Sequence, residues 1–180
     1  AIQLPNTKIK ILQQLLQQVI ADYKRTNKIK AMEFSERMKK LVEEYNNRHL
    51  DDFTVQVLDE VTKQLNDLLN DIKVDKEKFK ELGISFEEKA FYDILVSCAQ
   101  KFHFENQYPD DKMKDLAKKV KALVDDKTKY TDWDQRIDVK AEMEADLMIL
   151  LDDNGYPPVP RNEVYNEVFE QAENFKKYAG

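Results

Sequence analysis

Glycine and proline are almost absent from the interior of this chain, and no other feature constrains its fold as strongly. Gly83 and Gly155 stand where helical patterns end, and Gly180 closes the sequence. The five prolines also stand at the edges of segments: Pro5, Pro109, Pro157, Pro158 and Pro160. Residues 6–82 and 110–154 contain neither residue type. Because glycine supplies the positive φ of tight turns and proline removes a backbone donor, such stretches favour long helices over the loops that carry most catalytic sites.

The composition is typical of amphipathic helices. Charged residues make up 36% and hydrophobic residues 42% of the 180 positions, which is far from the composition of disordered chains. No apolar run approaches the roughly 18 residues of a membrane span, and residues 1–5 do not resemble a signal peptide. The one cysteine, Cys98, excludes an internal disulfide and is typical of a reducing compartment. We therefore expect a cytoplasmic protein with no membrane partner.

Charge is distributed unevenly along the chain. The net charge of −6 argues against an autonomous nucleic-acid binder. However, residues 8–40 carry nine basic and three acidic residues, and residues 132–173 carry twelve acidic and three basic ones. Such asymmetry is found where a surface faces a charged partner. It is equally explained if the two regions face each other or are simply solvated.

Apolar residues recur at spacings of three and four through the first half of the chain, as on one face of a helix. We expect one helix from Pro5 to a break at Asn27 and a second that ends at the polar residues 46–48. Asp51 or Asp52 is expected to cap a third helix. The three apolar stripes are Ile9, Leu12, Leu16, Val19 and Tyr23; Phe34, Met38, Leu41 and Tyr45; and Leu58, Val61, Leu65, Leu68 and Ile72.

Turn and capping signals divide the second half. The third helix is expected to run or bend through residues 73–82 and to stop at Gly83, and a capping box of Ser85 and Glu88 opens the next one. Residues 103–108 are expected to form a loop, and Thr131 with Asp134 forms a second capping box. The apolar stripes are Phe91, Ile94, Leu95 and Cys98; Met113, Leu116, Val120 and Leu123; Trp133, Ile137, Ala141, Met148 and Leu151; and Val164, Val168 and Phe175. The sequence thus predicts an all-α fold of six or seven helices packed as an irregular bundle, with no sheet, in a single domain over residues 1–180.

No pattern of catalytic, cofactor-binding or metal-binding residues is present. The run Pro109-Asp110-Asp111-Lys112 resembles a nuclease motif, but it lies at an expected helix start, where proline and aspartate are ordinary caps. His49 and His103 lack the Glu-x-x-His spacing of helical di-iron sites, and no phosphate-binding loop occurs. Cys98 lies on an apolar helical face, where packing is the more common role.

Several local patterns, taken in order, resemble the C-terminal helical region of the R (restriction and motor) subunit of type I restriction enzymes. These pieces are Leu4-Pro5-Asn6 with Lys8-Ile9, Phe34-Ser35-Glu36, Tyr45-Asn46-Asn47-Arg48, Glu81-Leu82-Gly83-Ile84-Ser85, Ala90-Phe91-Tyr92-Asp93, Asp132-Trp133 with Arg136, and Gly155-Tyr156-Pro157-Pro158. Each is weak alone, whereas the ordered set spans nearly the whole chain.

The resemblance implies a fragment of a larger multidomain subunit that is a Mg²⁺-dependent nuclease and an ATP-driven translocase of double-stranded DNA. It implies that this region is not catalytic, holds neither ATP nor Mg²⁺ itself, and assembles with the methyltransferase core of M and S subunits. The partner-interface candidates are Trp133, Arg136, Tyr156 and Pro157, although packing at a helix entry is the commoner use of aromatic residues placed like Trp133 and Tyr156.

The leading hypothesis from the sequence is a helical docking module, and two alternatives from other classes stay open. The first is a DNA-contacting element that sets Lys24, Arg25, Lys28 and Lys30 against phosphates. The helix that follows Trp133 is acidic, which argues against DNA contact from that helix. The second is an enzyme in its own right, for which the residues offer no centre.

Overall fold

Helices are the only regular secondary structure in the part that the structure, a computed structural model, describes: residues 3–48, 54–126 and 129–179. Seven of these helices have 15 residues or more, and α4 (Phe79–Leu82) is a single turn. No strand occurs in those ranges, so the predicted all-α fold is confirmed. The residues group into two compact units, one of Ala1–Lys24 with Lys30–Lys78 and one of Arg25–Ile29 with Phe79–Gly180. The expectation of a single domain over residues 1–180 stays a prediction.

The first unit contains α1 (Gln3–Lys24), most of α2 (Lys28–Asn46) and α3 (Val55–Glu77). The first and third of these helices pack against each other through the expected stripes, and the Tyr23 hydroxyl donates to Asp75 Oδ2 at 2.7 Å. The buried residues are Ile9, Leu16, Ile20 and Tyr23 on α1 and Val61, Leu65, Leu68 and Ile72 on α3. Pro5 lies in the first turn of α1, and Asn27 lies in the break before α2, as expected.

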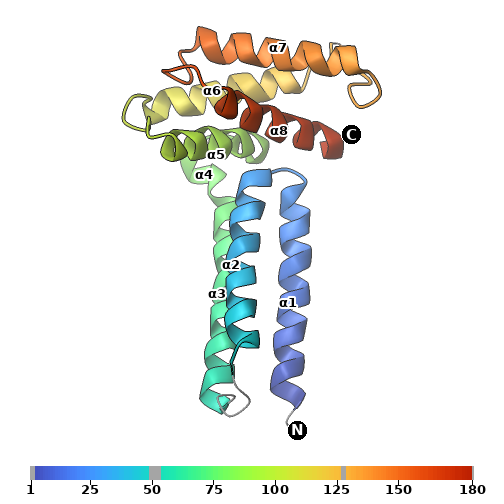
Figure 1. Cartoon of the computed structure of the whole chain (residues 1–180), viewed down its shortest axis with the longest axis vertical. Coiled ribbons are helices and arrows are strands. Elements are labelled where there is room, and N and C mark those ends of the chain that lie inside the picture. Colours follow the sequence, from blue (N-terminus) through green and yellow to red (C-terminus); the bar gives the residue numbers. More distant parts are fainter. Residues whose placement is uncertain (1–2, 49–53, 127–128, 180) are drawn as a thin grey trace. The chain divides into compact units, whose positions relative to one another are not determined.

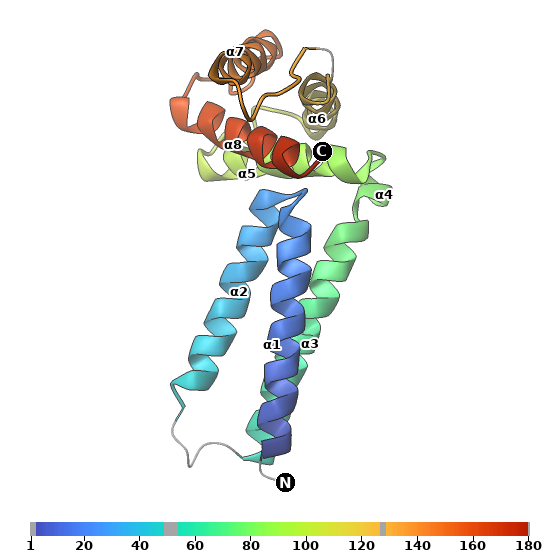
Figure 2. The ribbon, with the colours of Figure 1, turned by 90° about the vertical axis from the view of Figure 1, so that its right-hand side faces the viewer.

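Helix α2 is less deeply buried than its neighbours. Only Ala31 and Phe34 are buried on it, whereas Met38, Leu41 and Tyr45 are half-buried. Figure 2 shows that α2 diverges from α1 towards its C-terminal end. Asp51 and Asp52 lie outside the described residues, and the observed N-cap of α3 is Thr54, whose hydroxyl accepts from the Val57 amide at 3.2 Å.

The third helix ends earlier than predicted: α3 stops at Glu77, and the single turn α4 lies between it and Gly83. Helical structure then stops at Gly83, before α5 (Phe86–Lys101) begins. Gly83 has φ +70°, a conformation that other residues adopt only with strain. The Ser85 hydroxyl then accepts from the Glu88 amide at 3.0 Å, and the Glu88 carboxylate accepts from the Ser85 amide at 2.8 Å. This reciprocal capping box confirms the prediction and fixes the start of α5.

The second unit is built from α5, α6 (Asp110–Val124), α7 (Ile137–Asp153) and α8 (Asn162–Ala179). Helix α5 packs against α6 and α8, and both of these pack against α7 (Figure 1). The stripes predicted for α5, α6 and α8 are buried in this core, except that Leu123 is only partly buried. Residues 103–108 form the expected loop, whose Phe104 and Tyr108 rings meet Tyr156 edge to face at 5.4 and 5.3 Å between centroids.

The prediction for α7 is wrong in two respects. The helix begins at Ile137 and not at Thr131, because Asp132 has φ +60° and no side chain caps the helix. Its buried residues are Val139, Met143, Leu147 and Leu151, so of the predicted stripe only Leu151 is buried on the helix. Ile137, Ala141 and Met148 face solvent.

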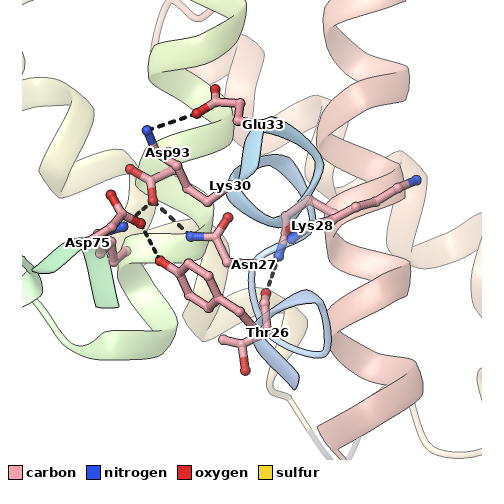
Figure 3. A network of polar contacts seen from close by, with 10 residues as sticks. Thr26, Asn27, Lys28, Lys30, Glu33, Asp75 and Asp93 are labelled. Carbon is pink, nitrogen blue, oxygen red and sulfur yellow. Dashed lines mark hydrogen bonds and ion pairs between the residues drawn. The ribbon is translucent and has the colours of Figure 1, made fainter. Parts of the chain in front are cut away.

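A buried polar network lies at the turn between α1 and α2, whose residues 25–29 belong to the second unit (Figure 3). The Lys89 ammonium on α5 is 1% exposed and contacts Asp93 Oδ2 at 2.6 Å, one helical turn further on. The same oxygen accepts from the Asn27 amide group at 2.8 Å. A second branch comes from α8, where the Gln171 side chain accepts from the Lys28 amide and donates to the Thr26 carbonyl.

Two carboxyl groups meet where α7 packs against α8. The hydrogen bond that Glu144 shares with Glu173 raises the pKa of Glu144 to about 7, and partial burial and the charge of Glu173 act in the same direction. The Lys140 ammonium lies 3.3 Å from Glu173 Oε2 and works against the shift. One proton shared between the two carboxyl groups therefore stabilises this contact.

We expect Asp93→Leu to lower the free energy of unfolding by about 3–5 kcal/mol, because Lys89 then stays buried without the carboxylate that it contacts. The double variant Lys89→Met with Asp93→Leu should lose much less, since both charges are removed. The exposed pair Asp115 and Lys119 has the same i,i+4 spacing, and Asp115→Leu should cost about 0.5 kcal/mol or less. Urea unfolding followed by circular dichroism compares the three variants, and equal losses from Asp93→Leu and Asp115→Leu would contradict the network's role.

The Glu144 pair predicts a pH dependence of stability. Because the folded pKa of Glu144 is raised above its ordinary value of 4.5, the folded state holds a proton that the unfolded state releases. Stability should therefore fall as the pH rises from about 4.5 to about 7. The variant Glu144→Gln should flatten this slope, whereas Glu142→Gln on the exposed side of α7 should keep it. Unfolding curves at half-unit steps of pH measure the slope, and an unchanged slope in Glu144→Gln would refute the assignment.

Candidate functional site

The segment before α7 holds Trp133 in a run of turns. Asp132 has φ +60°, which aspartate tolerates better than most residues, and its carbonyl accepts from the Gln135 amide at 3.0 Å and the Arg136 amide at 3.1 Å. Tyr130 is buried, and its hydroxyl donates to Asp146 on α7. These bonds place Trp133 at the edge of the core, where it is partly buried against the apolar cluster of the second unit.

Trp133 lines a pocket of about 360 Å³. Tyr130 and Phe175 supply further aromatic walls, while Asp132 and Lys176 bring charge to the lining. The Lys176 ammonium lies 6.0 Å from the centroid of the Tyr130 ring. An aromatic concavity with a few charged groups can accept one side chain of a partner. Of the four residues predicted for a partner interface, Trp133 is therefore placed where it can contact a partner.

Tyr156 and Pro157 are core residues in this structure. Tyr156 is 0% exposed, and its hydroxyl donates to the Leu95 carbonyl at 2.8 Å. Burial raises the pKa of Tyr156 well above its ordinary value. Pro157 is buried as well, and it follows a cis peptide bond. Neither side chain presents surface to a partner, so of the two roles left open for Tyr156 the structure shows packing.

Arg136 is exposed and directly precedes α7. Its guanidinium donates to both carboxylate oxygens of Asp138, at 2.6 and 3.2 Å. This hydrogen bonding lowers the pKa of Asp138. Arg136 is three residues and Asp138 five residues from Trp133, so a partner that contacts the start of α7 meets Trp133 and this pair together.

The solvent side of α7 is unusually apolar. Ile137 is 88%, Ile149 58% and Met148 41% exposed. Ala141 and Ala145 are also exposed, and the spacing of residues 137, 141, 145 and 148 sets them on one side of the helix. A single exposed apolar residue needs no explanation, but a contiguous row on one helix is typical of an interaction surface. We call these five residues the α7 apolar face.

Acidic residues flank the α7 apolar face. Asp138 and Glu142 are exposed near its beginning, and Asp152 and Asp153 are exposed at its end. No basic residue lies in the last turn of α7, where the negative end of the helix dipole favours one. The face thus combines apolar surface with a negative border.

The four candidate phosphate contacts are divided between the two units. Lys24 and Lys30 belong to the first, and Arg25 and Lys28 to the second. The Lys30 ammonium lies 3.2 Å from Glu33, and the Lys28 ammonium 3.2 Å from Glu170 on α8. The Arg25 guanidinium lies 5.9 Å from the centroid of the Tyr178 ring. Neighbouring carboxylates compete with phosphate for the two lysines that pair with them.

The remaining candidates for chemistry, Cys98 and Asp110, make contacts within the second unit. Cys98 is buried, its thiol donates to Glu167 Oε2 at 2.9 Å, and burial raises the pKa of the thiol, which disfavours the nucleophilic thiolate. Asp110 accepts from the Tyr92 hydroxyl at 2.5 Å and pairs with Lys114 in the first turn of α6. Within the described ranges, no cluster of three or more His, Cys, Asp or Glu residues is placed to hold a metal ion. None of the helices in those ranges is long and apolar enough to cross a bilayer.

Comparison with known proteins gives consistent matches. Residues 1–178 match the family of the C-terminal part of endonuclease subunits like that of the type I restriction enzyme HindI. The chain is 28% identical over 155 residues to a Methanocaldococcus jannaschii protein whose name assigns it to the endonuclease subunit of the type I restriction enzyme MjaIXP. It is 28% identical over 148 residues to the type I restriction enzyme HindI endonuclease subunit of Haemophilus influenzae.

The matches cover most of this chain and a small part of the relatives. Each spans 82% of this chain but 13% of the relative's length. No solved structure matches the chain. Since the family match extends over nearly all of the 180 residues, the resemblance found in the sequence is confirmed. The chain belongs to the family of C-terminal regions of type I restriction enzyme endonuclease subunits.

Proposed function

We propose that this chain is the non-catalytic docking module of an R subunit and attaches that subunit to the methyltransferase core of M and S subunits. Nuclease chemistry, ATP, Mg²⁺ and DNA translocation then belong to other parts of the subunit. Two observations support this division. The relatives are named endonuclease subunits and are about eight times longer than the matched region, and the described residues here bring no metal ligands or nucleophile together.

The α7 apolar face carries the proposal. Its exposed isoleucines and methionine add nothing to the core of the second unit. Their burial against a partner would contribute about 25 cal/mol of binding free energy per Å² of apolar surface. A stable assembly interface buries about 1,600 Å² in total, which exceeds the area of one helix face. The Trp133 pocket and the exposed Arg136 lie close in sequence to the start of α7 and offer additional contacts.

The DNA-contact alternative has weaker support. It needs Lys24, Arg25, Lys28 and Lys30 to reach phosphates, but two of these lysines already pair with carboxylates. The border of the α7 apolar face is acidic and would repel a nucleic acid. The salt dependence of binding distinguishes the two functions. Each phosphate contact lowers the logarithm of the association constant by about 0.9 per unit of log[salt], whereas apolar docking depends little on salt.

The proposal predicts that the R subunit needs this region to join the core. The intact R subunit, co-expressed with M and S, should co-purify with them. A version that lacks residues 1–180 of this chain should no longer co-purify but should retain DNA-stimulated ATP hydrolysis. Retained hydrolysis is the control that the remainder of the subunit is folded.

Two results would contradict the proposal. In the first, the truncated subunit still assembles with the core. In the second, the truncation leaves assembly intact but removes most of the DNA affinity together with a steep salt dependence, which would favour the DNA-contact alternative.

A further inference from the structure

We infer that the α7 apolar face binds an amphipathic helix with Lys and Arg along its edges, contributed by the methyltransferase core. This inference rests on the proposed docking function and names the surface and the chemistry of its partner. It is carried by three features of α7: the shape of the face, the charge around it and the helix end beside it.

The shape of the face suits a helix. Ile137 and Met148 are 11 positions apart, or about 17 Å along the axis, which is about three turns. Between them lie Ala141 and Ala145, both exposed and both small. With small residues between the large ones, the ridge of another helix can approach the middle of the face at 8–10 Å between axes. Ile149 widens the apolar surface on one side.

The charge around the face selects a basic partner. Asp138 and Glu142 border its first half, where Arg136 already pairs with Asp138 and the Lys129 ammonium lies 3.9 Å from Glu142. The charge that selects the partner therefore comes mainly from Asp152 and Asp153, which border the end of the face. Lys and Arg on the edges of a bound helix can reach these carboxylates while their stems cover apolar surface. A second copy of this chain, docked through the same face, would bring two acidic borders together and is therefore disfavoured.

The end of α7 adds an independent reason. Asp152 and Asp153 lie in the last turn, where the dipole is negative and acidic side chains are unfavourable. No basic residue offsets them within that turn. A basic side chain from a partner would stabilise the carboxylates and the helix end together.

The test uses the intact R subunit and the purified M and S core, with affinity measured by biolayer interferometry at 50, 150 and 300 mM NaCl. Ile137→Ser with Met148→Ser removes apolar surface without adding charge and should weaken binding at least about tenfold. Asp152→Lys with Asp153→Lys should weaken binding at least about tenfold at 50 mM and less at 300 mM, because salt screens the repulsion.

Matched controls lie on the first unit. Val55→Ser changes an apolar residue that is 74% exposed on α3, and Glu43→Lys with Glu44→Lys reverses two exposed carboxylates on α2. Both should bind as the unmodified subunit does. Because all substituted side chains are exposed, helix content should be unchanged; if the Ile137 and Met148 variant is unstable, Ile149→Ser supplies a second test of the same face.

The outcomes separate the inference from the function. If the unmodified subunit does not bind the core, the proposed docking function fails. If it binds and the α7 variants bind like the controls, the function stands and this inference is overturned. Light scattering tests whether a second copy of the chain occupies the face instead. If the unmodified subunit self-associates and the Ile137 and Met148 variant is monomeric, a second copy occupies the face and the inference is overturned.

Discussion

The buried ion pair between Lys89 and Asp93 is the interaction that fixes the turn between α1 and α2 within the second unit. An ammonium that is 1% exposed is tolerable only beside a carboxylate, and Asp93 lies one turn further along α5 at 2.6 Å. The same carboxylate holds Asn27, so the turn between α1 and α2 is bound to α5 by a directional contact. Gln171 binds that turn from α8, which adds specificity that apolar packing alone does not supply.

Helix α7 has two apolar sides, and only one of them packs in the core of the second unit. Val139, Met143, Leu147 and Leu151 face α6 and α8, while Ile137, Met148 and Ile149 face solvent. A helix that is apolar on both sides is expected inside a larger core or at an interface. The matched region spans 13% of the length of each relative, and an interface of this second side with another part of the assembly is the use that we propose.

Local signals in the sequence predicted most of the fold. The stripe of α3 and the Ser85 capping box are each determined by neighbouring residues, and the structure confirms them. The end of α3 at Glu77 was not predicted, because no glycine or proline marks it. The start of α7 was mispredicted because a positive φ at Asp132 and the tertiary bond from Tyr130 to Asp146 override the capping pattern at Thr131. Packing was one of the two roles left open for Tyr156, but its partners Phe104, Tyr108 and Leu95 could not be predicted, because all three are distant in sequence. The exposed side of α7 had a visible signal, namely apolar residues in two competing stripes.

Photo-crosslinking from α7 tests the central claim most directly. A photoreactive amino acid in place of Ile149, in the intact R subunit assembled with M and S, should form crosslinks to a subunit of the methyltransferase core. Mass spectrometry of the crosslinked peptide should identify a helical segment rich in Lys and Arg. Crosslinks that form only within the R subunit itself, or none at this position in an assembled complex, would contradict the account.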